Sequence, residues 1–193
     1  MATTGLEYVV CAPYQETGGV ASYGKGMVVT KAIKADLAIN LNDAYLYADN
    51  AIDEAVNEFR DGRLTINGSY LEYEAMAMLF GHELTGEPGK EELIARGEDS
   101  GEYVGTGFFA TVMRNNVKAY RAIWLPKVKY GVPGESLETK ADSIKFGTPT
   151  IEGTILTDID GVWKVEAMLE TRAAAIEWLN DKANITKANI TTD

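Results

Sequence analysis

The chain of 193 residues has the length of one domain and can bury a sizeable core. Hydrophobic residues make up 46% of it, which excludes a disordered chain, and its apolar runs fall short of the roughly 20 residues that a membrane helix needs. Cys11 is the single cysteine and excludes an internal disulfide framework, while a net charge of −11 argues against a protein that binds nucleic acid.

The first ten residues contain no basic residue and no long apolar block. We therefore expect no signal peptide, and the lone cysteine fits assembly in a reducing cytoplasm.

Strand patterns dominate the chain. Alternating apolar and polar residues predict strands over Ala35–Asn42 and Arg63–Tyr70. Between these two strands, residues 42–58 have the length of a long loop. The remaining predicted strands are Gly107–Met113, Val117–Val128, Ser143–Phe146, Thr150–Leu156 and Val162–Leu169.

Turn residues punctuate this strand-rich region. Arg114-Asn115-Asn116 predicts a hairpin turn, because Asn tolerates positive φ, and Asp160-Gly161 predicts a second turn. Pro126 lacks a backbone N–H, so its strand must lie at an edge or contain a bulge there.

Two helices are expected. Glu72–Phe80 has its apolar residues at helical spacing, with Gly81 as the stop and Ser69 with Glu72 as a capping box. The residues that recur at this spacing are Leu71, just before the helix, and Ala75, Met78 and Leu79 within it. Arg172–Asn184 is the second helix, with Ile176 and Leu179 on its buried side, and residues 185–193 are expected to be a frayed tail. One mainly β (α+β) domain follows, an antiparallel β-sandwich or barrel with one or two flanking helices.

The negative charge is concentrated in two segments. Residues 42–62 carry six acids and one base, and residues 83–102 carry seven acids and two bases, so each segment is net −5. Residues 114–129 carry five bases and no acid. These segments are either solvated loops or complementary surfaces for self-association. For the second case, the predicted charge partners are Arg121, Lys127 and Lys129.

Three short motifs between Ser22 and His82 occur in a characteristic order. They are Ser22-Tyr23-Gly24, Leu46-Tyr47-Ala48-Asp49-Asn50 and Leu79-Phe80-Gly81-His82. This order resembles the major tail protein family of long-tailed bacteriophages, which build the tail tube. Asn50 and Phe80 depart mildly from the commonest family residues, and the resemblance weakens after His82 and returns over Thr139–Gly153.

The resemblance implies a virion structural protein with a tail-tube-like fold. Members assemble as rings, commonly hexameric, which stack into a tube that conducts the viral genome into the host. The implied partners are further copies of the chain and other tail proteins at the tube ends, with DNA passing through the lumen without specific binding. The implied location is the virion tail after assembly in the host cytoplasm. A tube of a tail-derived bacteriocin or injection machine is an alternative that would share this fold.

The loop over residues 42–58 is the predicted ring-stacking contact, because it is long and carries apolar residues that a solvated loop would not need. The predicted interface residues are Tyr45, Leu46, Tyr47, Asp49, Asn50, Ile52 and Val56.

Catalytic patterns are weak, and we expect no catalytic, cofactor-binding or metal-binding residues. His82 is the only histidine, so zinc ligands are too few, and its position after Gly81 suits a structural role at a helix end. Gly105-x-Gly107 continues into a strand, whereas a dinucleotide fingerprint requires a helix. A carbohydrate-active β-sandwich enzyme is the alternative from another class, with Glu166 and Glu170 as the carboxylates nearest an apolar strand.

Overall fold

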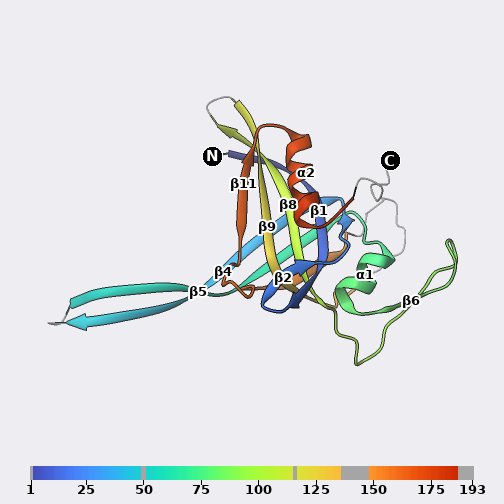
Figure 1. Cartoon of the computed structure of the whole chain (residues 1–193), viewed down its shortest axis with the longest axis horizontal. Helices are drawn as coiled ribbons and strands as arrows, with labels where there is room; N and C mark the ends of the chain where they lie inside the picture. Colours follow the sequence, from blue (N-terminus) through green and yellow to red (C-terminus); the bar gives the residue numbers. More distant parts are fainter. Residues whose placement is uncertain (1, 49–50, 115–116, 136–147, 187–193) are drawn as a thin grey trace, which may run out of the picture.

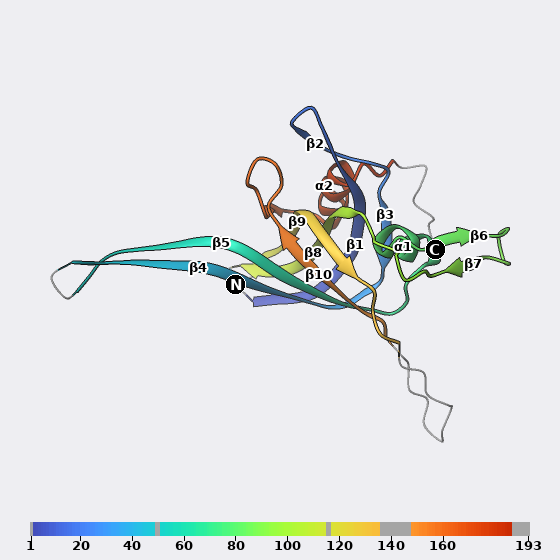
Figure 2. The same cartoon turned by 90° about the horizontal axis from the view of Figure 1, so that it is seen from below.

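The computed structural model describes residues 2–48, 51–114, 117–135 and 148–186 (Figure 1). A curled antiparallel sheet forms the body, with two helices beside it and a two-stranded ribbon projecting from it (Figures 1 and 2). The strands are β1 (Ala2–Thr17), β2 (Val20–Tyr23), β3 (Met27–Thr30), β4 (Ala32–Ala48), β5 (Ala51–Gly68), β6 (Glu83–Thr85), β7 (Glu92–Ile94), β8 (Tyr103–Arg114), β9 (Val117–Gly131), β10 (Thr150–Leu156) and β11 (Val165–Leu169). The helices are α1 (Tyr73–Phe80) and α2 (Arg172–Lys182). The predicted mainly β class with flanking helices is therefore confirmed.

The large sheet has the strand order β2-β1-β8-β9-β10-β5-β4, with β11 also paired to β9 and β3 also paired to β1. Strands β6 and β7 form a separate small sheet. Every pair is antiparallel. Because the large sheet curls, strands β5 and β10 pack across the interior from β1 and β8.

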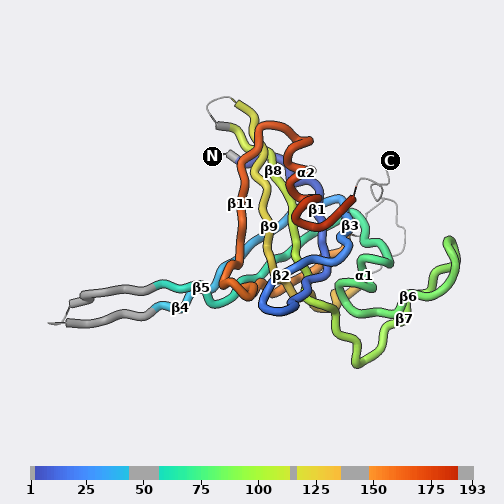
Figure 3. Tube along the Cα trace, in the orientation of Figure 1, coloured from blue at the N-terminus to red at the C-terminus, as the bar shows by residue number. Residues whose placement is uncertain are grey.

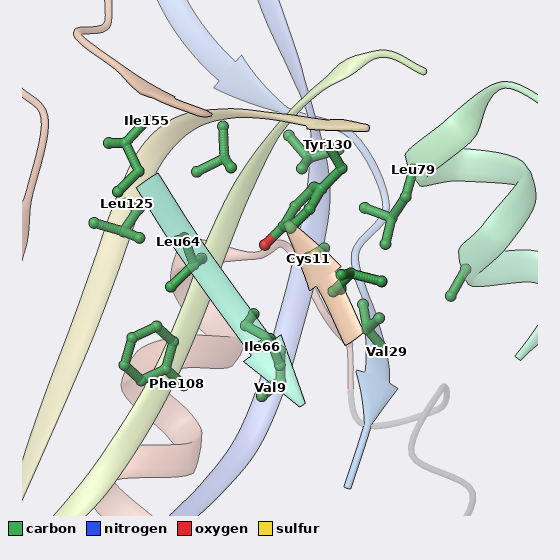
Figure 4. Close-up of a cluster of buried hydrophobic side chains, with 14 of the residues drawn as sticks. Val9, Cys11, Val29, Leu64, Ile66, Leu79, Phe108, Leu125, Tyr130 and Ile155 are labelled. Carbon is green, nitrogen blue, oxygen red and sulfur yellow. The ribbon is translucent and has the colours of Figure 1, made fainter. Parts of the chain in front are cut away.

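The inner face of the curled sheet holds the main core (Figure 4). Val9 from β1, Leu64 from β5 and Leu125 from β9 are fully buried there, and Leu79 of α1 closes one end. Cys11 and Tyr130 add a buried polar chain through Thr106, whose hydroxyl lies 3.4 Å from the Cys11 sulfur and 3.1 Å from the Tyr130 hydroxyl.

The outer face of β1, β8 and β9 holds a second core beneath α2. Val10, Phe109 and Trp124 are buried there against Ala175 and Leu179 of the helix. Because neighbouring residues in a strand point to opposite faces, Val9 and Val10 contribute to different cores, as do Phe108 and Phe109. Burial on both faces explains why these strands have consecutive apolar residues.

Pro126 lies where β9 changes partners. On one side β9 pairs with β11 through Trp124, and from Lys127 onward the same side pairs with β10. The pairing with β8 shifts register at this point, which is the bulge that the sequence allowed. The Pro126 carbonyl accepts a hydrogen bond from the Tyr23 hydroxyl at 3.1 Å. A residue without an N–H thus occupies the gap between two partner strands.

Gly105 and Gly107 leave room for the Trp124 ring. A Cβ at Gly105 would lie 2.3 Å from Trp124, and one at Gly107 would lie 2.6 Å from Leu179. The glycine pair therefore serves close packing between a strand, its neighbour and α2, and the strand continues after it, as the sequence indicated.

Helix α1 has the predicted apolar side, and Gly81 ends it in the left-handed conformation at φ 77° with its N–H donating to the Ala77 carbonyl. The predicted capping box is wrong. The N-cap is Glu72, in extended backbone, and no side chain caps the helix. Ser69 instead contacts the end of a strand connection, where its N–H donates to the Lys31 carbonyl at 3.0 Å.

Helix α2 begins at the predicted residue, where the Thr171 hydroxyl accepts from the Ala174 N–H at 3.1 Å, and ends at Lys182. The predicted frayed tail is wrong at its first residue. Ile185 is buried in the outer core, and its N–H donates to the Asn180 carbonyl at 2.9 Å. Residues 187–193 of that tail lie outside the described residues.

The predicted hairpin of β8 and β9 and the strand β10 are confirmed, although Asn115-Asn116 lies outside the described residues. The strand predicted from Val162 begins at Val165, after a turn in which Gly161 has φ 77°. The strand predicted over Ser143–Phe146 also lies outside the described residues.

Leu79 tests whether α1 is part of the core. Leu79→Ala should lower the free energy of unfolding by about 2–5 kcal/mol, because its side chain is fully buried. The measurement is urea unfolding of the purified variant. Tyr73→Ala, at a position 46% exposed in the same helix, should change it by less than about 0.5 kcal/mol. Equal losses for the two variants would contradict burial of α1 through Leu79.

Candidate assembly interface

The most prominent surface feature is a two-stranded arm, defined here as residues 41–48 of β4 and 51–59 of β5. The two strands pair from Leu41↔Phe59 to Ala48↔Ala51. Strand β10, the other neighbour of β5, pairs only with residues 62–67, so no third strand pairs with the arm among the described residues. The coloured parts of β4 and β5 leave the body side by side (Figures 1 and 3). At 3.2–3.4 Å per residue, an arm with eight residues in β4 has a length of about 25 Å.

The prediction of a long loop over residues 42–58 is wrong, because these residues form the arm. Pairing within the ribbon satisfies backbone groups that a loop would leave to water. Of the predicted contact residues, Tyr45, Leu46 and Tyr47 lie in β4, and Ile52 and Val56 lie in β5. Their register partners include Tyr45↔Ala55 and Tyr47↔Ile52. Asp49 and Asn50 lie outside the described residues.

A hairpin signal was present in the sequence. Asp and Asn are residue types that favour tight turns, and Asp49-Asn50 separates Ala48 from Ala51, which pair with each other. The consecutive apolar residues Tyr45, Leu46 and Tyr47 obscured the alternation that identifies a strand.

Strands β6 and β7 form a second, shorter projection, at the opposite end of the long axis from the arm (Figures 1 and 2). Its base is held by His82, which is buried and lies 3.0 Å from the Asp99 carboxylate through Nδ1. The same carboxylate accepts from the Arg96 N–H at 2.7 Å. The histidine thus has the structural role that its position after Gly81 indicated.

These contacts act on the acidity of Asp99. The Arg96 N–H, followed by the imidazole of His82, holds the pKa of the Asp99 carboxyl below its usual value. The charged form of Asp99 is therefore favoured in the folded chain, so the stability of the base of the second projection depends on pH.

The predicted charge partners all have partners within the chain. Arg121 donates to both carboxylate oxygens of Glu166, at 3.1 and 2.6 Å. The Lys127 amine lies 3.8 Å from the Glu16 carboxylate. Lys129 donates to the Gly101 carbonyl at 2.5 Å, and all three predicted charge partners are therefore engaged within the chain.

Sequence reasoning missed two tyrosines beside these lysines. The Lys127 amine lies 4.9 Å from the ring centre of Tyr14 and 5.0 Å from that of Tyr103, and the Lys129 amine lies 5.0 Å from Tyr103. These residues are far apart in the sequence, and no local pattern brings them together.

Glu166, one of the two carboxylates considered for an enzyme, does not have the raised pKa that a general acid requires. A general acid needs a raised pKa, whereas the guanidinium of Arg121 and then the amine of Lys164 hold the pKa of Glu166 below its usual value. A hollow of about 370 Å³ beside β10 has one carboxylate, Glu152, which lies 3.5 Å from Arg63. Its other lining residues are Gly131, Val132, Pro133, Gly134 and Thr150.

Within the described ranges, no three His, Cys, Asp or Glu side chains gather closely enough to hold a metal ion. No helix in the same ranges is long and apolar enough to cross a membrane. Comparison with models of known protein families gives no match, and a search of curated proteins gives none.

Asp99 gives a prediction for pH. Because its folded-state pKa is lowered, its stabilising contribution is present above the unfolded pKa, about 3.9, and is lost as the pH falls through the folded value. Asp99→Asn should therefore unfold more easily than the wild type at neutral pH, with the gap closing in acid. Urea unfolding at a series of pH values measures this gap. A gap that stays constant down to the most acidic point would contradict the role of the carboxylate charge.

Proposed function

We propose that this chain is the structural subunit of a phage tail tube, polymerising as stacked rings into the conduit that delivers the genome. The single observation that carries the proposal is the arm, a ribbon of about 25 Å with which no third strand pairs in the part of the chain that the structure describes. The resemblance in the three motifs between Ser22 and His82 supplies the kind of assembly. The mainly β body supports it, because open sheet edges can pair between subunits around a ring.

The energetics of the arm support a partner. An isolated two-stranded hairpin is marginally stable in water at best, and needs a further strand or surface to become independently stable. The described chain supplies no third strand beyond Phe59. A neighbouring subunit of the next ring would supply that surface, and the arm would then be ordered by assembly.

Charge supports a conduit. The arm contains four acids and no base, namely Asp43, Asp53, Glu54 and Glu58, and the whole chain has a net charge of −11. A net negative or neutral lumen repels phosphate, so DNA slides through it, whereas a basic wall would hold DNA through salt-sensitive contacts. The proposed partners are other copies in rings, for which the resemblance suggests six subunits, and tail proteins at the tube ends.

Shortening the arm tests the proposal. Joining Ala44 to its register partner Val56 through Asn-Gly removes residues 45–55 and closes the ribbon with a favoured hairpin turn. The shortened chain should keep the wild-type thermal midpoint and circular dichroism spectrum but fail to polymerise in a sedimentation assay.

The matched control replaces only Asp49-Asn50 with Asn-Gly, which introduces the same turn and keeps the full arm. This control should polymerise as the wild type does. Tubes of normal length from the shortened chain would show that the arm does not join rings.

Salt provides an independent test of the arm charge. If the acidic arm meets a complementary surface, sodium chloride should slow polymerisation, because the screening length falls from about 10 Å at 0.1 M to about 3 Å at 1 M. Asp53→Asn/Glu54→Gln should polymerise with a weaker dependence on salt. Light scattering across a salt series measures the polymerisation rate of the wild type and of the variant. If the two rates depend on salt concentration in the same way, the arm carboxylates are only solvated.

A further inference from the structure

The arm leaves the body beside a tryptophan from a distant part of the chain. The ring of Phe59, at the base of the arm, is stacked on the ring of Trp163 with centres 4.6 Å apart and an angle of 1° between their planes. Both side chains are partly buried and pack against the inner core. The stack therefore joins the base of the arm to the body.

The backbone of β5 is irregular at this point. Asn40 pairs with Asp61 and Leu41 pairs with Phe59, so Arg60 is an extra residue that forms a bulge. Bulges bend a strand and increase its local twist. The Asp61 carboxylate accepts from Arg60 Nε at 2.7 Å and from the Asn40 amide, which closes the bulge across both strands.

Trp163 is held by a tight turn. The Asp158 side chain accepts from the N–H groups of Asp160 and Val162, at 3.0 and 2.8 Å, and the Asp158 N–H donates to the Val162 carbonyl at 2.9 Å. Immediately after the tryptophan, the Lys164 amine lies 4.8 Å from the Trp163 ring centre and 2.8 Å from Glu166 in β11. Contacts on both sides of Trp163 thus hold it to the body.

We propose that Trp163 is a positioning residue that fixes the direction in which the arm leaves the body. The bulge gives the ribbon a place to bend, and the stack with Phe59 selects one bend. Without the indole, the arm would keep its internal pairing but sample a range of directions about Arg60. The effect on the isolated chain stands by itself, while its consequence for ring stacking depends on the proposed function.

The first experiment measures arm direction in unassembled chains. Spin labels on cysteines introduced at Ala44 and Glu177 report the spread of distances between the arm and α2. Cys11 does not interfere, because it is fully buried and burial raises the pKa of its thiol to about 12. Trp163→Ala should broaden the distance distribution, and Trp163→Phe, which keeps a ring for stacking, should restore most of the wild-type width.

Trp178→Ala is the matched control. Trp178 is also partly buried and also has a lysine amine above its ring, that of Lys182 at 5.7 Å, but it lies on α2. This variant should leave the distance distribution unchanged. In the same samples, hydrogen exchange of the amides of residues 57–59 should accelerate about two- to tenfold in Trp163→Ala alone, the range expected for one aromatic pair.

The second experiment compares polymerisation of the same variants. Trp163→Ala should require a higher protein concentration to polymerise, whereas Trp163→Phe and Trp178→Ala should match the wild type. An unchanged distance distribution in folded Trp163→Ala overturns the inference. If Trp163→Ala broadens the distribution but the wild-type chain never polymerises, the positioning role is supported and the proposed function is rejected.

Discussion

Burial of β1, β8 and β9 on both faces is the constraint on which the rest of the structure depends. One face closes over the inner core with β5, β10 and α1, and the other carries α2. This layer contains the largest fully buried side chain, Trp124, and close approach at Gly105 and Gly107 leaves it little room to rearrange. Strand β9 connects this closely packed layer to the neighbouring strands, because it pairs with β11 before Pro126 and with β10 after it.

The arm projects from this closely packed body through strand β5. Strand β5 is buried where β10 pairs with it, through Leu64 and Ile66, and becomes half of a two-stranded ribbon beyond Gly62. The same strand therefore changes from a core element to a marginal one within a few residues. An element of this kind is suited to become ordered on a partner, and a fixed exit direction lowers the conformational cost of that step.

Local patterns predicted much of this fold. Strands β9 and β10 and both helices follow from alternation, helical spacing and end signals that lie within a few residues of one another. Strand β1 was not predicted, because burial on both faces removes alternation from Val9–Ala12. The arm was predicted as a site but with the wrong structure, since Tyr45-Leu46-Tyr47 lacks a period of two. The stack of Phe59 on Trp163 joins residues more than a hundred positions apart, and no single-sequence pattern encodes such a contact.

We propose above all that this chain assembles with itself into rings and tubes. Electron microscopy of the purified, unmodified chain in negative stain, over a series of protein concentrations, tests it most directly. Rings that stack into tubes of uniform diameter, increasing with concentration, are the predicted result. A folded chain that remains monomeric by size exclusion at every concentration, with neither rings nor tubes in the images, would contradict it.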